Sequence, residues 1–168
     1  MIIGIGGISN AGKSRLASRI KSYFSEKKVA VLCQDDYVFP KEKIPLIRDH
    51  IDWESPKSID FMKFENAVHE AIASNEIVII EGIFAFHYKS TCELMDKCLF
   101  LTLDHRFFFM RKNNDLRWGK EPDWYIEHIW NSHLKYSKNN IPDNSMVIKA
   151  GKDIDIQKVV DFIYDHVK

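Results

Sequence analysis

The sequence of 168 residues has little cysteine and no excess of charge of either sign. Its 24 lysines and arginines balance 24 aspartates and glutamates, so no overall field draws the protein to nucleic acid, and any anion must bind locally. The three cysteines, Cys33, Cys92 and Cys98, lack the C-x-x-C spacing of metal sites and cannot all pair. This usage favours buried thiols in a reducing compartment.

Long apolar runs and targeting patterns are also lacking. No stretch approaches the roughly 20 apolar residues that cross a bilayer, and the N-terminus enters an apolar run directly, without a charged region and cleavage site. We therefore expect a cytoplasmic protein with no membrane partner. With 45% hydrophobic and 12% aromatic residues, no repeat and no low-complexity tract, the composition is that of one folded domain with a sizeable core.

A phosphate-binding motif stands near the N-terminus. Residues 7–14 read Gly-Ile-Ser-Asn-Ala-Gly-Lys-Ser and fit the P-loop pattern G-x-x-x-x-G-K-[ST], between an apolar run and a helical pattern that begins near Lys13. Backbone N–H groups of such a loop turn toward phosphates, the lysine adds charge, and the serine hydroxyl suits Mg²⁺. A Gly-rich turn without a ligand is the alternative, which the flanking elements disfavour. The predicted nucleotide-binding residues are Gly7, Ser9, Asn10, Ala11, Gly12, Lys13 and Ser14.

Strands alternate with helices along the rest of the chain. Apolar runs predict strands at 29–33, 77–82 and 98–103 and a weaker one at 145–148, and helical spacing predicts helices at 61–72, at 106–112, after Pro122 and at 156–167. The order predicts an α/β fold with a parallel sheet covered by helices on both faces. With the P-loop motif, we expect a P-loop NTPase fold of three layers with a five-stranded sheet, which resembles the nucleoside monophosphate kinases. We expect a single domain over 1–168, with a substrate loop at about 37–58 and a short lid at about 113–123.

Two carboxylates end predicted buried strands. Asp35 follows the run 29–33 and Glu81 ends the run 77–80, so both should lie at the sheet edge where ligands bind. A buried carboxylate needs a cation or a hydrogen-bonded partner, and Mg²⁺ would supply the cation. The alternatives are a turn cap for Asp35 and a solvated strand end for Glu81. Asp36 is interpreted as a neighbour that orients the loop or a water, because alternation along extended chain sends adjacent side chains opposite ways.

Several blocks together resemble a known family. Residues 2–17, the Gln-Asp-Asp-Tyr block at 34–37, the Glu-Gly-x-x-x-Phe block within 79–89 and the tract 124–136 are similar to the nicotinamide riboside kinase branch of the uridine kinase-like P-loop kinases. The resemblance covers most of the chain. It implies ATP-dependent phosphorylation of the 5′-hydroxyl of a riboside, with Asp35 as the general base and with Ser14 and Glu81 in the Mg²⁺ shell.

The segment 52–60 departs from the family pattern. The family places an Asp after an aromatic residue to hold the ribose hydroxyls, and here Glu54, one methylene longer, follows Trp53. Asp52 could compete for that role. The indole of Trp53 could favour a cationic pyridinium ring through cation–π attraction, or it could pack the loop against the body. Asp36, Trp53 and Glu54 are the predicted substrate-binding residues.

The predicted lid supplies cations for phosphoryl transfer. Arg111 is the predicted catalytic cation alongside Lys13, and Arg117 is predicted to bind nucleotide, with Lys112 and Lys120 nearby. A solvated helix end is the alternative for Arg111, Lys112 and Lys120. The base of the nucleotide could be read near 145–152. His128 and Trp130 match the family tract at helical spacing, and we assign them no chemistry.

The leading hypothesis is therefore a kinase that uses ATP and Mg²⁺ on a small-molecule riboside, with nicotinamide riboside favoured over uridine or cytidine. A kinase for another small hydroxyl compound is the second hypothesis. A nucleotide-binding module without transfer activity is the third, and the presence of Asp35 argues against it. We expect no nucleic-acid partner, and a monomer or homodimer.

Overall fold

The computed structural model describes residues 1–117, 119–151 and 153–165. Trp118 of the predicted lid, Lys152 of the predicted base-reading segment and Val167 of the predicted last helix lie outside the described residues. The five strands of the main sheet pair in the order β2-β5-β1-β6-β7, all parallel, so the predicted α/β fold class with a five-stranded parallel sheet is confirmed. The strands are β1 (Ile2–Gly7), β2 (Val29–Cys33), β5 (Ile77–Glu81), β6 (Lys97–Thr102) and β7 (Met146–Lys149).

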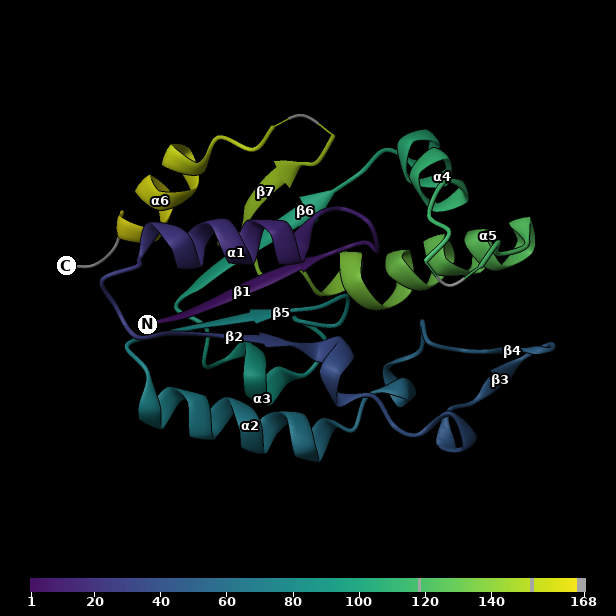
Figure 1. The fold of residues 1–168 in the computed structure, drawn as a ribbon, viewed down its shortest axis with the longest axis horizontal. Coiled ribbons are helices and arrows are strands. Elements are labelled where there is room, and N and C mark those ends of the chain that lie inside the picture. The colour runs from purple at the N-terminus through teal and green to yellow at the C-terminus, as the bar shows by residue number, and fades with distance from the viewer. Residues whose placement is uncertain (118, 152, 166–168) are drawn as a thin grey trace.

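Helices cover both faces of this sheet, with α1 and α6 along one face and α2 along the other (Figure 1). The alternation of β5 explains the two layers, because Ile77 and Ile79 join the cluster under α1 whereas Val78 and Ile80 pack against α2. The helices are α1 (Lys13–Tyr23), α2 (Phe61–Ser74), α3 (Lys89–Cys92), α4 (His105–Asn113), α5 (Asp123–Ser132) and α6 (Ile156–Tyr164).

Two expectations about elements are wrong. The strand β2 was expected to be buried, but it pairs only with β5 and lies at the edge of the sheet, so Val31 is exposed. The reason is the strand order: β5 lies between β1 and β2, so β2 has a neighbouring strand on one side only. Pro122, expected in the first turn of a helix, is instead the residue before α5, where its extended backbone ends the preceding segment.

The predicted substrate loop contains a small hairpin. Its strands β3 (Leu46–Ile47) and β4 (His50–Ile51) are antiparallel and form a separate two-stranded sheet. Short 3-10 turns flank it at Gln34–Tyr37, Lys41–Lys43 and Pro56–Ser58. Within the described residues, no helix combines the length and the apolar composition that crossing a membrane requires.

Candidate active site

The P-loop joins the central strand β1 to α1. Gly7 has φ 137°, and a Cβ there would collide with the carbonyl oxygen of Leu101 on β6, so the chain can leave the strand in this direction only with glycine. Asn10 and Gly12 also have positive φ, 60° and 96°. The loop thus curls at the carboxyl end of β1, directly before the N-terminus of α1, where unpaired N–H groups and the helix dipole attract anions.

Ser14 and Glu81 meet at this edge of the sheet. The Ser14 hydroxyl donates to Glu81 Oε1 at 2.6 Å, and Glu81 is 3% exposed. No group of three or more His, Cys, Asp or Glu side chains in the described part of the chain could hold a metal ion by itself. Mg²⁺ bound with a nucleotide keeps several waters and takes phosphate oxygens, so it needs few protein ligands. The two oxygens of Ser14 and Glu81 fit that requirement.

Lys13 faces the acidic residues of the site. Its ammonium donates to the carbonyl oxygen of Ile8 at 3.2 Å. Burial lowers the pKa of Lys13, while the charges of Glu81, Asp35 and Glu54 oppose that shift. The structure thus brings the P-loop lysine into the field of three predicted carboxylates that are far apart in the sequence.

Asp35 lies in the turn Gln34–Tyr37 that follows β2. Desolvation raises the pKa of Asp35, Lys13 lowers it, and Glu81 raises it further. Because this turn is a 3-10 helix, the alternation argument used for Asp36 is wrong. Asp35 and Asp36 are both exposed to solvent, so the expectation that Asp35 would be a buried carboxylate is also wrong. The side chain of Gln34 is fully buried, and its Oε1 accepts the N–H of Phe84 at 3.1 Å. Gln34 thereby ties the Asp35 turn to the chain that follows Glu81.

Glu54 and Asp52 have different surroundings. Burial raises the pKa of Glu54 to about 7, with Lys112 opposing the shift and Asp35 adding to it. Asp52 Oδ1 lies 2.7 Å from His128 Nε2, so its carboxylate already has a partner. Trp53 between them is half-buried, and its carbonyl oxygen accepts the Ser58 hydroxyl at 3.1 Å. Of the two acids, Glu54 is the one that faces Lys13 and Asp35.

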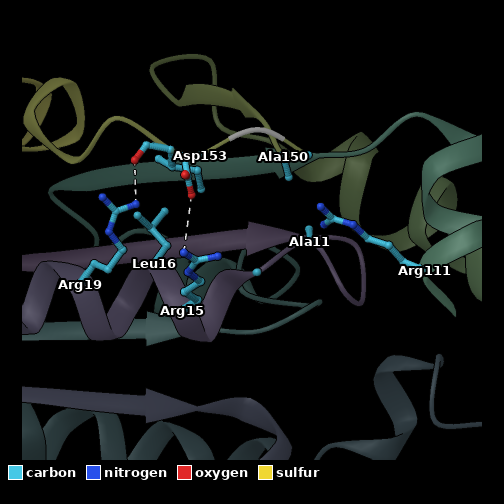
Figure 2. A pocket seen from close by; sticks show the side chains of 10 residues that line it. Ala11, Arg15, Leu16, Arg19, Arg111, Ala150 and Asp153 are labelled. Atoms are coloured by element: carbon cyan, nitrogen blue, oxygen red, sulfur yellow. Dashed lines mark hydrogen bonds and ion pairs between the residues drawn. The ribbon is translucent and has the colours of Figure 1, made fainter. Parts of the chain in front are cut away.

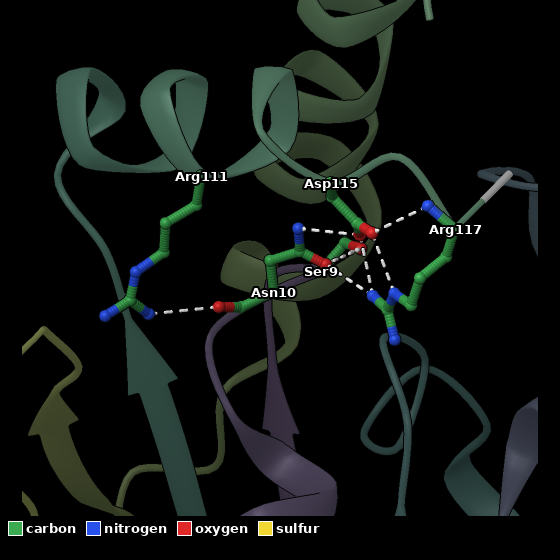
Figure 3. Close-up of polar contacts among 5 residues, drawn as sticks. All are labelled: Ser9, Asn10, Arg111, Asp115 and Arg117. Carbon is green, nitrogen blue, oxygen red and sulfur yellow. Dashed lines mark hydrogen bonds and ion pairs between the residues drawn. The ribbon is translucent and has the colours of Figure 1, made fainter. Parts of the chain in front are cut away.

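The lid contacts the P-loop through a compact polar cluster, shown in Figure 3. Arg117 binds both oxygens of Asp115, each at 2.7 Å, and donates to Asn10 Oδ1 at 3.2 Å. The Asn10 amide in turn donates to Asp115 at 3.0 Å. These hydrogen bonds hold the pKa of Asp115 well below its ordinary value, and those from the Arg117 side chain have the largest effect. Arg111 donates to the Asn10 carbonyl oxygen at 3.1 Å.

The other lid cations differ in exposure. Lys112 is 8% exposed, so the alternative of a solvated helix end is wrong for this residue, and its charge acts on Glu54 inside the site. Lys120 is exposed. The contact of Arg111 with the P-loop backbone also contradicts a purely solvated side chain there.

A pocket lies on the outer side of the P-loop, between α1 and the chain after β7. Figure 2 shows Arg15 and Arg19 reaching into this region from α1 and Arg111 from α4. Arg19 donates to the carbonyl oxygen of Ile154 at 2.7 Å, and Arg15 pairs with Asp153 at 3.5 Å. The predicted base-reading segment at 145–152 contributes Ala150 and Gly151 to the lining.

Known proteins resemble this chain in sequence and in fold. No family model matches it. Nicotinamide riboside kinase 1 of Homo sapiens is 24% identical over 99% of this chain and 94% of the relative, and the uridine kinase of Chlamydia pneumoniae is 32% identical over 62% and 58%. The structure of a possible uridine kinase from Bacillus stearothermophilus superposes with a TM-score of 0.57 at 15% identity, over 87% of this chain and 88% of that one.

In sequence the chain is similar to nicotinamide riboside kinases and uridine kinases, and in fold it is similar to P-loop kinases. The predicted resemblance to nicotinamide riboside kinases is confirmed, as is the predicted enzyme class, a phosphotransferase with an alcohol group as acceptor. At the carboxyl edge of the sheet, Lys13 and the Ser14–Glu81 pair lie in the same electrostatic field as Asp35.

Sequence reasoning did not predict the contacts of five residues around this site. Asp115, Gln34 and the pair Asp52–His128 hold other site residues in place, and Lys112 supplies a buried cation. Two signals in the sequence could have indicated them: an acid two positions before the lid arginine, and a glutamine that opens the Gln-Asp-Asp block. A signal for the Asp52–His128 pair is absent, because its partners are 76 positions apart.

Proposed function

We propose that this protein transfers the γ-phosphoryl group of ATP, bound with Mg²⁺, to the 5′-hydroxyl of a riboside, and that nicotinamide riboside is favoured over uridine. The observation that carries the proposal is the convergence of Lys13, the Ser14–Glu81 pair and Asp35 on one sheet edge, with Glu54 in the same electrostatic field. A module that only binds nucleotide would not require Asp35 or Glu54 there.

Each residue has a defined part in this reaction. The P-loop backbone and Lys13 bind the phosphates, and Ser14 and Glu81 hold Mg²⁺, which supplies charge neutralisation at the transferred group. Asp35 accepts the proton of the acceptor hydroxyl, and its raised pKa makes it a stronger base than an ordinary aspartate. Arg111 and Arg117, which contact the P-loop residue Asn10, bring positive charge beside the phosphates.

The acceptor is assigned to the side of the site where Glu54 lies. Its carboxylate accepts hydrogen bonds from the ribose hydroxyls, because Asp52 is engaged by His128. The neighbouring indole of Trp53 has no aromatic or cation–π partner among the described side chains, so it is available to stack on a base. An electron-rich indole face attracts a cationic pyridinium more than a neutral pyrimidine.

The test is product formation when ATP and Mg²⁺ are offered with a panel of ribosides that includes nicotinamide riboside, uridine and cytidine. We expect turnover of ribosides, with the highest kcat/KM for nicotinamide riboside. The Asp35→Asn variant should bind ATP nearly as well as the wild type and lose about a hundredfold or more in kcat, the usual size of a general-base contribution. Normal turnover by Asp35→Asn would place the base elsewhere.

The Trp53→Leu variant tests the preference for a cationic base. Leucine keeps an apolar contact but removes the π face, so nicotinamide riboside should lose about 1 to 2 kcal/mol more in kcat/KM than uridine does. Equal losses for the two substrates would make Trp53 a packing residue and remove this support for the pyridinium substrate.

A further inference from the structure

The segment that carries Trp53 and Glu54 directly follows a very short hairpin. β3 and β4 have two residues each and pair only with one another, Leu46 with Ile51 and Ile47 with His50. Hairpins this short are not stable in water by themselves. Ser58 holds the Trp53 carbonyl oxygen from the far side of the segment, and the position of the near side depends on what the hairpin packs against.

The hairpin packs against the first turns of α5. The Tyr125 hydroxyl donates to the Ile51 carbonyl oxygen at 2.8 Å. The guanidinium carbon of Arg48 lies 4.3 Å from the centre of the Trp124 ring, and the His50 ring meets the same indole edge-on at 4.9 Å. These contacts place the hairpin on a helix that begins where the lid ends.

One polar pair closes this interface at the residue next to Trp53. His128 Nε2 and Asp52 Oδ1 are 2.7 Å apart, and the two side chains are only 19% and 18% exposed. The Ser132 hydroxyl oxygen lies 3.5 Å from the same nitrogen. A short hydrogen bond to a carboxylate that is shielded from water is much stronger than a surface ion pair.

We propose that His128 is a positioning residue for the acceptor site: it holds the carboxylate of Asp52 and thereby fixes the direction of Trp53 and Glu54. The proposal rests on the proposed riboside kinase function. It explains why Asp52 is not the residue that binds the ribose hydroxyls. It also means that α5, which begins where the lid ends, contacts the acceptor segment. Nucleotide binding at the P-loop does not depend on this pair.

The test measures kcat, the KM for riboside and the KM for ATP in His128→Ala and His128→Gln. His128→Ala should raise the KM for riboside about tenfold or more, because a charge-assisted hydrogen bond is lost, and should change the KM for ATP by less than about twofold. His128→Gln keeps an N–H donor for Asp52 and should recover most of the loss. If His128→Ala fails to fold, Asp52→Asn tests the same pair from its other side, and it should likewise raise the KM for riboside and leave the KM for ATP nearly unchanged.

The chain offers a matched control. His105 on α4 and Glu127 on α5 form the same type of pair, 3.2 Å apart, but both side chains are nearly half exposed. Among the described residues, neither has a hydrogen bond, ion pair or aromatic contact with the hairpin. His105→Ala should leave both KM values unchanged. An unchanged KM for riboside in His128→Ala, or an equal rise in both KM values, would overturn the proposal. No turnover of any riboside by the wild type would instead overturn the proposed function.

Discussion

Glu54 is surrounded by groups that act on its charge in opposite directions. Burial raises its pKa from an ordinary value of 4.5 to about 7, and Asp35 adds to the rise, while Lys112 and Lys13 lower it. An acid in this setting is costly to ionise in the folded protein, although the ionised form is the one that accepts hydrogen bonds from a sugar. Ligand recognition and stability therefore make opposite demands on this residue.

Replacing Glu54 with Gln should stabilise the ligand-free protein in a pH-dependent way. The pKa of Glu54 is higher in the folded protein than in the unfolded chain, so the folded protein binds more protons between about pH 4.5 and 7. The free energy of unfolding of the wild type therefore falls as the pH rises through that window. Glu54→Gln removes this loss. At pH 8 it should gain up to about 3 kcal/mol in free energy of unfolding, and the gain should shrink toward zero as the pH falls from about 7 to 4.5.

Melting temperatures of both proteins at pH 5 and pH 8 check this expectation, and kcat/KM for a riboside at pH 8 provides its counterpart. The same substitution should lower kcat/KM by about 2 to 4 kcal/mol for every riboside, since an accepting carboxylate is lost whatever base is attached. A variant that melts at the wild-type temperature at pH 8 would show that Glu54 is not desolvated.

Residues of the site were predictable from the sequence where a motif fixes the backbone. Lys13 and Ser14 follow from the P-loop spacing, and Asp35 and Glu81 from their place after apolar runs. Lys112 was not predictable, because its burial depends on how α4 is rotated above Glu54, and local spacing does not reveal that rotation. The substrate-binding and catalytic roles given to these residues stay predictions.

At the scale of elements, the contact between the lid and the P-loop depends on one acid. Asp115 accepts hydrogen bonds from Asn10 and from the backbone and guanidinium of Arg117, and its side chain is 9% exposed. Because the Arg117 guanidinium is fixed by two parallel hydrogen bonds, its direction over the P-loop is set by Asp115 and not by its own flexible chain.

If Asp115 acts through Arg117, their removal should not be additive. Asp115→Ala and Arg117→Ala should each lower kcat by about tenfold, and the double variant should lose little more than either single one. Lys120→Ala, which removes an exposed cation from the same segment, should stay within about twofold of the wild type and serves as the control. If the loss of kcat in the double variant equals the product of the two single losses, the two residues act independently.

The strands of the main sheet and the helices α2 and α4 were predicted within one or two residues, and the short elements were not predicted at all. The span of β2 agrees with its apolar run, and α2 has the helical spacing of its apolar residues, since burial fixes both patterns. The hairpin β3–β4 and the four-residue helix α3 are set by contacts with distant elements, Tyr125 with Ile51 among them. Such contacts leave no local signal in the sequence.

The site belongs to the molecule as a whole because of the strand order. β1 lies between β5 and β6, so the P-loop emerges at the centre of the sheet, beside the ends of β5 and β2 that carry Glu81 and the Asp35 turn. All strands run parallel, and their carboxyl ends therefore form a single edge where a ligand can contact several of them. The P-loop, Glu81 and the Asp35 turn therefore lie at one edge of the same sheet.

Nucleotide binding should therefore raise the melting temperature of the whole chain. A ligand present at 100 times its Kd adds about 2.7 kcal/mol to the free energy of unfolding, which corresponds to roughly 5 to 10 °C for a protein of this size. We expect a shift of this order with a non-hydrolysable ATP analogue and Mg²⁺. The measurement is a thermal melt of the wild type and of Lys13→Ala, each with and without the analogue.

Lys13→Ala should lose most of this shift and yet melt near the wild-type temperature without ligand. Burial lowers the pKa of Lys13, which means that the folded protein pays a desolvation penalty for its charge, and removing that charge leaves the apolar core intact. A riboside added alone should shift both proteins equally, because Lys13 binds phosphate and not the sugar. If the analogue stabilises Lys13→Ala as much as the wild type, the nucleotide does not bind at the P-loop.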